Sequence, residues 1–115
     1  MPRPLRCRMV RTPPLARRFG PYDLAPPGEV VLPVEGLEAL RLTDLEGLEQ
    51  EEAAQIMGVS RQTFGRVLAA ARGVVSAVLT GGLGLRIEGG AYEMAPPLPG
   101  PGRGRRGRGG RGRGF

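Results

Sequence analysis

Hydrophobic positions follow a helical period through the middle of the chain. Between residues 60 and 81 apolar side chains recur three, four and seven residues apart, which is typical of a helix with one buried face. The members of this stripe are Phe64, Val67, Leu68, Ala71, Val75 and Val78. Ser60 is a good N-cap and Gly81-Gly82 a good stop, so the pattern predicts one long helix between them.

Two shorter helices are expected before this long one. Residues 35–45 carry leucines around much of the helical circumference, which indicates a helix contacted on several sides. Residues 50–57 predict a second helix with two alanines and Met57 on its inner face. Gly58 follows as its stop.

Only short strands are expected outside the helices. Residues 7–10 and 30–32 are brief runs that could be extended. Apolar residues alternate at positions 83, 85 and 87, and Gly89-Gly90 is a two-residue turn signal. Residues 83–94 therefore predict a short C-terminal β-hairpin.

Glycine and proline divide the chain into regions. Its 115 residues include 20 glycines and 12 prolines, most of them outside residues 34–80. Proline breaks helices, and segments rich in proline, glycine and charge do not bury a core. We therefore expect a basic proline-rich arm at 1–28, one folded domain at 29–94, and a disordered Pro/Gly/Arg tail at 95–115.

The charged residues are distributed unevenly among these three regions. The formal net charge is +6 and the sequence pI is about 11.2, with arginine as the sole basic residue type. All eleven acidic residues lie within residues 23–94, whereas both ends of the chain are basic. Such an excess of arginine indicates a polyanionic partner, either nucleic acid or an anionic membrane surface.

The residue inventory excludes most catalytic chemistry. There is no histidine and one cysteine, Cys7, so Ser–His or Cys–His mechanisms and a Cys/His zinc site cannot be built. We expect no enzymatic activity, no metal and no cofactor. No apolar run approaches the ~20 residues that span a bilayer, and no signal peptide is evident. The expected location is the cytoplasm, in association with the nucleoid and not with a membrane.

The join between the second and third helices fits a helix-turn-helix. This motif needs a small residue where its helices touch, a glycine or its equivalent in the turn, and apolar residues facing the core. Ala54 and Gly58 fill the first two roles. The apolar positions are filled by Ala53, Met57, Val59, Phe64 and Val67. The expected fold is mainly α with a helix-turn-helix.

The start of the third helix carries side chains suited to reading DNA. Arginine can bridge both acceptors of guanine, and glutamine can do the same for adenine. The expected DNA-binding residues are Ser60, Arg61, Gln62, Thr63, Arg66 and Arg72, of which Arg72 would reach a phosphate. The expected partner is double-stranded DNA. The alternative is an ordinary helical hairpin whose polar face is solvated.

Each basic end of the chain has two interpretations. The RGG-like tail would follow the phosphates of DNA or RNA without choosing sequence, or it serves solubility alone. Its arginines are Arg103, Arg105, Arg106, Arg108, Arg111 and Arg113. In the arm, Arg6 and Arg8 either enter a minor groove or pair with the acidic middle of the chain. Cys7 between them is either a redox-sensing thiol or a buried cysteine.

Several runs of the sequence resemble a known prokaryotic family. They are Leu37-Glu38-Ala39-Leu40-Arg41-Leu42, Asp44-Leu45-Glu46-Gly47-Leu48, Gln50-Glu51-Glu52-Ala53-Ala54 and Gly58-Val59-Ser60-Arg61-Gln62-Thr63-Phe64-Gly65-Arg66. Arg3-Pro4 and Arg6-Cys7-Arg8 at the start and Leu85-Arg86-Ile87-Glu88-Gly89-Gly90 near the end fit as well. Over residues 1–94 the chain is similar to domain of unknown function 134, also called UPF0251.

This resemblance implies DNA binding and a winged-helix-like or sigma region 4-like three-helix core. Region 4 of sigma factors reads promoter DNA, so the likeness is one of fold. The chain departs from the family where Glu49 replaces the usual Ser or Thr, which is a better N-cap. Gly73-Val74 replace the common lysines, and Cys7 is the single cysteine where some members have more.

Taken together, the sequence predicts a sequence-specific DNA-binding protein, a transcriptional regulator with its recognition helix near residues 60–79. A homodimer is compatible with this role, although no heptad repeat indicates one. One alternative is an RNA-binding or ribonucleoprotein-associated factor that acts through the Arg/Gly tail. Another is a module that binds other proteins through its helices.

Overall fold

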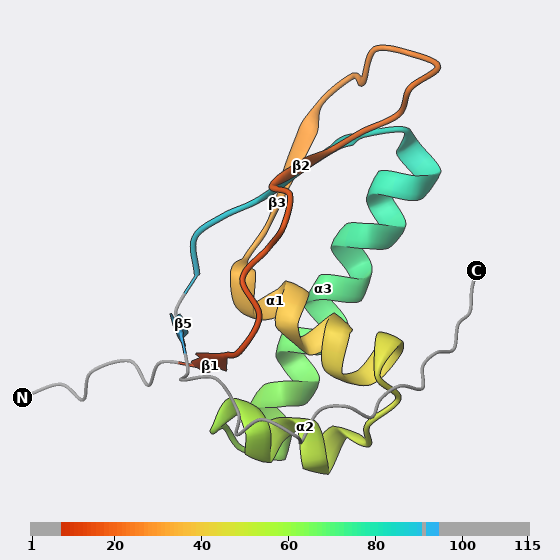
Figure 1. Cartoon of the computed structure of the whole chain (residues 1–115). Coiled ribbons are helices and arrows are strands. Elements are labelled where there is room, and N and C mark those ends of the chain that lie inside the picture. The colour runs from red at the N-terminus through yellow and green to blue at the C-terminus, as the bar shows by residue number, and fades with distance from the viewer. Residues whose placement is uncertain (1–7, 91, 95–115) are drawn as a thin grey trace, which may run out of the picture.

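The computed structural model describes residues 8–90 and 92–94, and helices make up the larger part of its regular structure (Figure 1). The helical segments are α1 (Val34–Leu40), its π-helical extension η1 (Arg41–Leu45), α2 (Gln50–Met57) and α3 (Arg61–Gly81). The strands are β1 (Arg8–Val10), β2 (Arg18–Phe19), β3 (Glu29–Leu32), β4 (Gly84–Ile87) and β5 (Tyr92–Met94). The predicted helical core is confirmed, and every helix lies close to its expected bounds.

Helix α1 packs against α3 at a close approach. A Cβ atom built on Gly36 of α1 would lie 3.0 Å from Leu32 Cδ1 and 3.3 Å from Ala71 Cβ in α3. A Cβ at position 36 would therefore require Leu32 or Ala71 to shift by a few tenths of an ångström. Glycine and alanine at this crossing let the two helices share one core.

A short segment, residues 58–60, connects α2 to α3, and local signals end the first helix and begin the second. Gly58 ends α2 in the left-handed conformation, with φ +70°, which favours glycine. The Ser60 Oγ accepts a hydrogen bond from the Thr63 N–H at 3.0 Å and caps α3 as predicted. At the start of α2, the Glu49 N–H donates to Glu52 Oε1 at 3.2 Å. This capping box caps α2, although position 49 holds a glutamate in place of serine or threonine.

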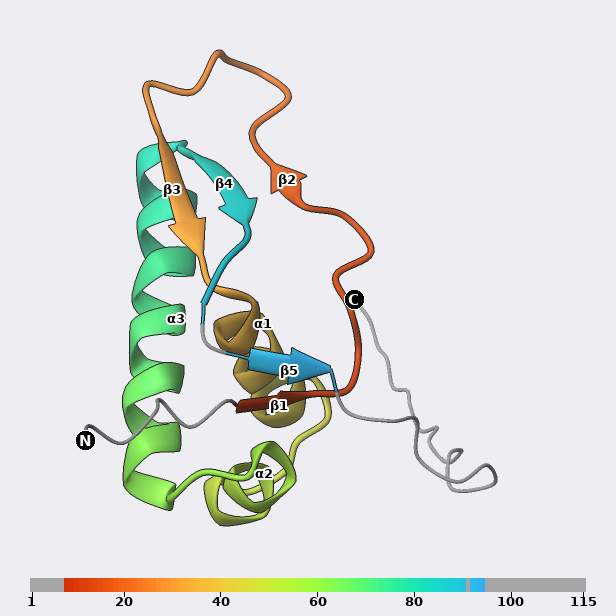
Figure 2. The same ribbon diagram turned by 90° about the vertical axis from the view of Figure 1, so that its left-hand side faces the viewer.

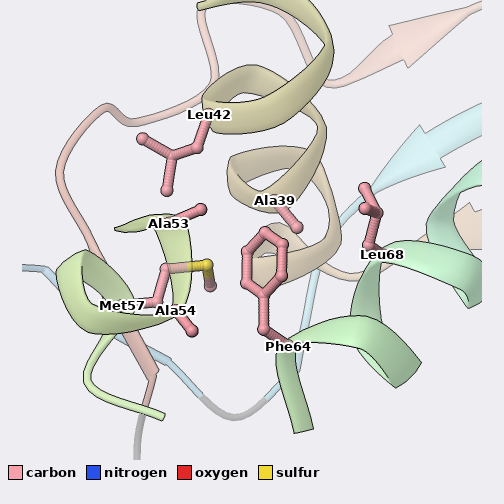
Figure 3. Packing of buried hydrophobic residues seen from close by; sticks show 7 residues of the cluster. All are labelled: Ala39, Leu42, Ala53, Ala54, Met57, Phe64 and Leu68. Carbon is pink, nitrogen blue, oxygen red and sulfur yellow. The ribbon is translucent and has the colours of Figure 1, made fainter. Parts of the chain in front are cut away.

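The apolar stripe of α3 contributes to two hydrophobic clusters. Phe64 and Met57 are fully buried, and Phe64 points from α3 toward Ala39 of α1 (Figure 3). The first cluster joins α1, η1, α2 and α3 through Ala39, Leu42, Ala53, Ala54, Met57, Phe64 and Leu68. The second joins the strands to the helices through Val10, Leu32, Val34, Ala71, Leu85 and Ile87. Burial of these side chains is the main source of stability.

The strands form two small sheets, and the predicted C-terminal hairpin is wrong. β4 pairs in parallel with β3 and antiparallel with β2, whereas β5 pairs in parallel with β1. Gly89 and Gly90 have φ values of +75° and +101°, but they carry the chain from one sheet to the other. Alternation at residues 83–87 signalled a strand correctly; its partners come from distant parts of the chain.

Residues 8–19 belong to the same folded body as the C-terminal strands. β1 and β2 pair with β5 and β4, so hydrogen bonding crosses the boundary expected near residue 28. Val10 is fully buried in the second cluster. The extended piece expected at 7–10 is present as β1, apart from Cys7, which lies outside the described residues.

Helix α3 forms one side of the molecule, with the strands and α1 along the other (Figure 2). An 18-residue window of α3 has a mean hydropathy of 1.3 and only 17% of it is buried. By length and composition this helix could cross a membrane, contrary to the expectation that no segment would qualify. One such helix is by itself weak evidence for a membrane span.

Candidate nucleic-acid interface

The first two turns of α3 carry five of the six residues expected at the DNA. Figures 1 and 2 show α2 lying across the N-terminal end of α3, at one end of the molecule. Ser60, Arg61, Gln62 and Arg66 are exposed there, and Thr63 is half-buried. The chain's own body does not cover these side chains, so a flat or grooved partner has access to them.

Several arginines outside α3 are paired within the described part of the protein, whereas Arg61 and Arg66 are not. Arg18 forms an ion pair with Glu29 at 2.9 Å, and Arg17 donates to a backbone carbonyl of β4 at 3.3 Å. Arg61 and Arg66 are exposed and have neither an ion pair nor a hydrogen bond within the described residues. Their guanidinium groups are therefore available for an external acceptor.

Arg72, the sixth predicted residue, is held by another part of the protein. Its Nη2 lies 2.7 Å from Asp44 Oδ1 and its Nε lies 3.2 Å from Asp44 Oδ2. This two-bond arrangement with η1 raises the pKa of Arg72, chiefly through the hydrogen bonds to Asp44. A phosphate would have to compete with that carboxylate for the guanidinium group.

Acidic side chains are exposed on the helix that precedes α3. Glu49, Glu51 and Glu52 are exposed around the start of α2 and form no ion pair within the described part of the chain. Glu51 and Glu52 complement the dipole of α2. The described residues contain nine arginines and eleven acids, a formal charge of −2. The positive charge that dominates the whole chain is therefore located mainly outside them.

Sequence reasoning missed Gln50, the first residue of α2. Its Oε1 lies 3.6 Å from the position that a Cβ on Gly65 would occupy, so its side chain lies against α3. The available signal was Gly65 itself, a glycine inside a helix where most residues are better helix formers. Its φ is not positive, and a Cβ at this position would make only an ordinary van der Waals contact with Gln50 Oε1.

The basic arm is fastened to the domain through a buried carboxylate. Glu38 is only 2% exposed and accepts hydrogen bonds from the Arg11 backbone N–H at 3.0 Å and from Arg41 Nε and Nη2 at 2.9 Å each. The pKa of Arg41 is raised mainly because Glu38 accepts these bonds. Of the arm residues expected to pair with the acidic middle, Arg8 forms no ion pair within the described residues, and Arg6 lies outside them.

No group of three potential metal ligands occurs among residues 8–90 and 92–94. The six tail arginines and Cys7 lie outside these residues.

A model of the family described as protein of unknown function DUF134 matches residues 1–95. The chain belongs to this family. A UPF0251 protein of Thermoanaerobacter sp. (strain X514) is 47% identical over 96 residues, which cover 82% of this chain and 85% of that protein. A UPF0251 protein of Caldicellulosiruptor bescii is 54% identical over 92 residues, covering 80% of this chain and 65% of that protein. No solved structure matches the chain significantly. The match to DUF134 ends where the Arg/Gly tail begins.

Proposed function

We propose that this protein binds double-stranded DNA in a sequence-specific way, with α2 and α3 acting as a helix-turn-helix and α3 as the recognition helix. The observation that carries the proposal is the availability of Arg61 and Arg66. They are exposed on the first two turns of α3 and have no partner within the described residues. Arginine side chains presented at a helix start fit the guanine edge in the major groove.

The shape of α3 favours the same function. Along the face that carries Gln62 and Arg66, the next residues are Ala69 and Gly73, both exposed. Small residues at these positions let the helix axis approach the floor of a groove. The short connection through Gly58 sets α2 across the start of α3 (Figure 1), where Arg61 and Gln62 remain exposed, and helix-turn-helix proteins join their two helices by a similarly short turn.

The acidic residues at the start of α2 limit how strongly the folded domain attracts DNA. Glu49, Glu51 and Glu52 repel phosphates, so the folded domain by itself attracts DNA weakly. We propose that the domain selects the sequence and that the arginine-rich ends supply general attraction. This division of roles fits a transcriptional regulator in the nucleoid; binding as a homodimer is part of the same proposal.

Selection of bound sequences from a random DNA pool tests this function directly. The full chain should enrich a defined motif, and Arg61→Ala and Arg66→Ala should each relax one position in it. Each bidentate contact provides about 1–3 kcal/mol of discrimination. Arg18→Ala is the matched control, because it removes an exposed arginine on the far sheet and should leave the motif unchanged.

Enrichment of no motif at any salt concentration would rule out sequence-specific binding. Equal losses for Arg61→Ala, Arg66→Ala and Arg18→Ala on every sequence would mean that α3 does not read DNA.

A further inference from the structure

We infer that Gln50 is a further specificity-determining residue of this interface and reads the edge of an adenine. The inference rests on the proposed DNA binding and extends it from α3 to the first turn of α2. It begins from a contact between the two helices, in which Gln50 Oε1 comes within 3.6 Å of the Cβ position at Gly65. The amide group therefore lies on the same part of α3 as the exposed polar residues.

The amide of Gln50 is unsatisfied by the protein. Its side chain is half-buried, yet it forms no hydrogen bond within the described residues. Its amide oxygen and nitrogen are not among the buried polar atoms without a hydrogen-bond partner, so the two donors and the acceptor of this carboxamide are open to solvent. An accessible amide that lies against α3 and has no partner within the described residues can bind a ligand that supplies both a donor and an acceptor.

Gly65 is the position that admits this side chain. It lies in the interior of α3 with ordinary helical conformation, so the helix would be more stable with alanine or a larger residue there. A large side chain at position 65 would occupy the space in which the Gln50 amide now lies.

The surrounding charge favours a base edge over a phosphate. A phosphate that accepts from Gln50 would lie at the start of α2, which also carries the exposed carboxylates of Glu49, Glu51 and Glu52. Base edges carry no net charge, and adenine presents an amino donor and a ring acceptor that match a carboxamide in two bonds. Adenine in the major groove is therefore the partner that fits Gln50.

The test compares DNA motifs selected by the full chain and by three variants. Gln50→Ala should lose its preference at one A·T pair, by about tenfold, while the rest of the motif is kept. Gln50→Glu should shift the same position toward cytosine, whose amino group donates to a carboxylate. Gln55→Ala is the matched control, since it removes an exposed glutamine from the same helix and should leave the motif unchanged.

Several outcomes would overturn the inference. An unchanged motif for Gln50→Ala, or an equal loss of affinity on all sequences, would mean that Gln50 does not read a base. In either case the wild-type motif would still support DNA binding by α3. Failure of the wild-type chain to select any motif would overturn the proposed function and this inference together.

Discussion

The buried carboxylate of Glu38 connects the N-terminal segment at Arg11 to the continuous helix formed by α1 and η1. It lies in α1 and accepts hydrogen bonds from the Arg11 backbone and from Arg41 at the start of η1. An ionised carboxylate at this depth is tolerated because its oxygens are occupied by donors and one partner is charged. The pair thereby holds the N-terminal strand region against the helices.

We expect Glu38→Ala to lower the free energy of unfolding by about 3–5 kcal/mol, because it leaves the partly buried Arg41 without its main partner. Chemical denaturation measures this. Glu46→Ala is the control: it removes the exposed partner of the same arginine, at 3.2 Å, and should cost less than about 1 kcal/mol. Equal losses for the two variants would contradict the role assigned to Glu38.

The pH dependence of Arg41 follows from the direction of its pKa shift. Its pKa is raised in the folded protein by the hydrogen bonds to Glu38, so folding favours the charged guanidinium. The resulting stabilisation is complete below the ordinary arginine pKa and is lost only as the pH rises through the folded value. Between neutral and mildly alkaline pH, Arg41 therefore contributes no change in stability.

At the scale of elements, the helices were predictable from the sequence and the strand pairing was not. The period of α3 and its caps at Ser60 and Gly82 are local signals, and the structure places them as expected. The alternation of apolar residues at 83–87 predicts a strand but does not indicate which strands pair with it. β4 pairs with β2 and β3, and these pairings depend on the whole fold.

In the candidate site, too, some features could be predicted from the sequence and others depend on the fold. The exposure of Arg61, Gln62 and Arg66 follows from the helical period, so these residues could be identified from sequence. The pairing of Arg72 with Asp44 joins residues 28 positions apart and requires knowledge of how η1 lies against α3. The contact between Gln50 and Gly65 is hidden from the sequence for the same reason.

Two glycine substitutions should have opposite effects on helix stability. Gly58→Ala places a side chain at φ +70° and should reduce the free energy of unfolding by about 1–2 kcal/mol. Gly73→Ala lies in the helical interior of α3 with no atom within 4 Å of the new Cβ, and should add up to about 1 kcal/mol. Urea denaturation of both variants gives the signs; loss of stability for Gly73→Ala would refute the open position assigned to it.

At the scale of the whole molecule, charge and fold occupy different parts of the chain. The described residues carry −2, whereas the full chain carries +6. The six arginines of the tail supply much of this difference. Electrostatic affinity for nucleic acid therefore depends on residues beyond the folded domain, and sequence choice depends on the helices within it.

We predict that removing residues 100–115 weakens binding to all DNA sequences by a similar factor and leaves the selected motif unchanged. The dependence of log K on log salt should become shallower by up to about five, because six fewer phosphates are neutralised. Fluorescence anisotropy at several salt concentrations measures both quantities. Tight RNA binding by the tail alone, with no DNA motif for the full chain, would support the alternative of an RNA-binding factor.

The pairing of β1 with β5 has a consequence for how the protein is made. Val10 is paired with Met94, so the ribosome must add more than eighty residues before the first strand can find its neighbour. Chains emerge at roughly 5–20 residues per second, and pairings between distant segments form slowly. The nascent helices can assemble early, but β1 stays an open edge until synthesis has passed Met94, and completion of this fold is therefore a late event in translation.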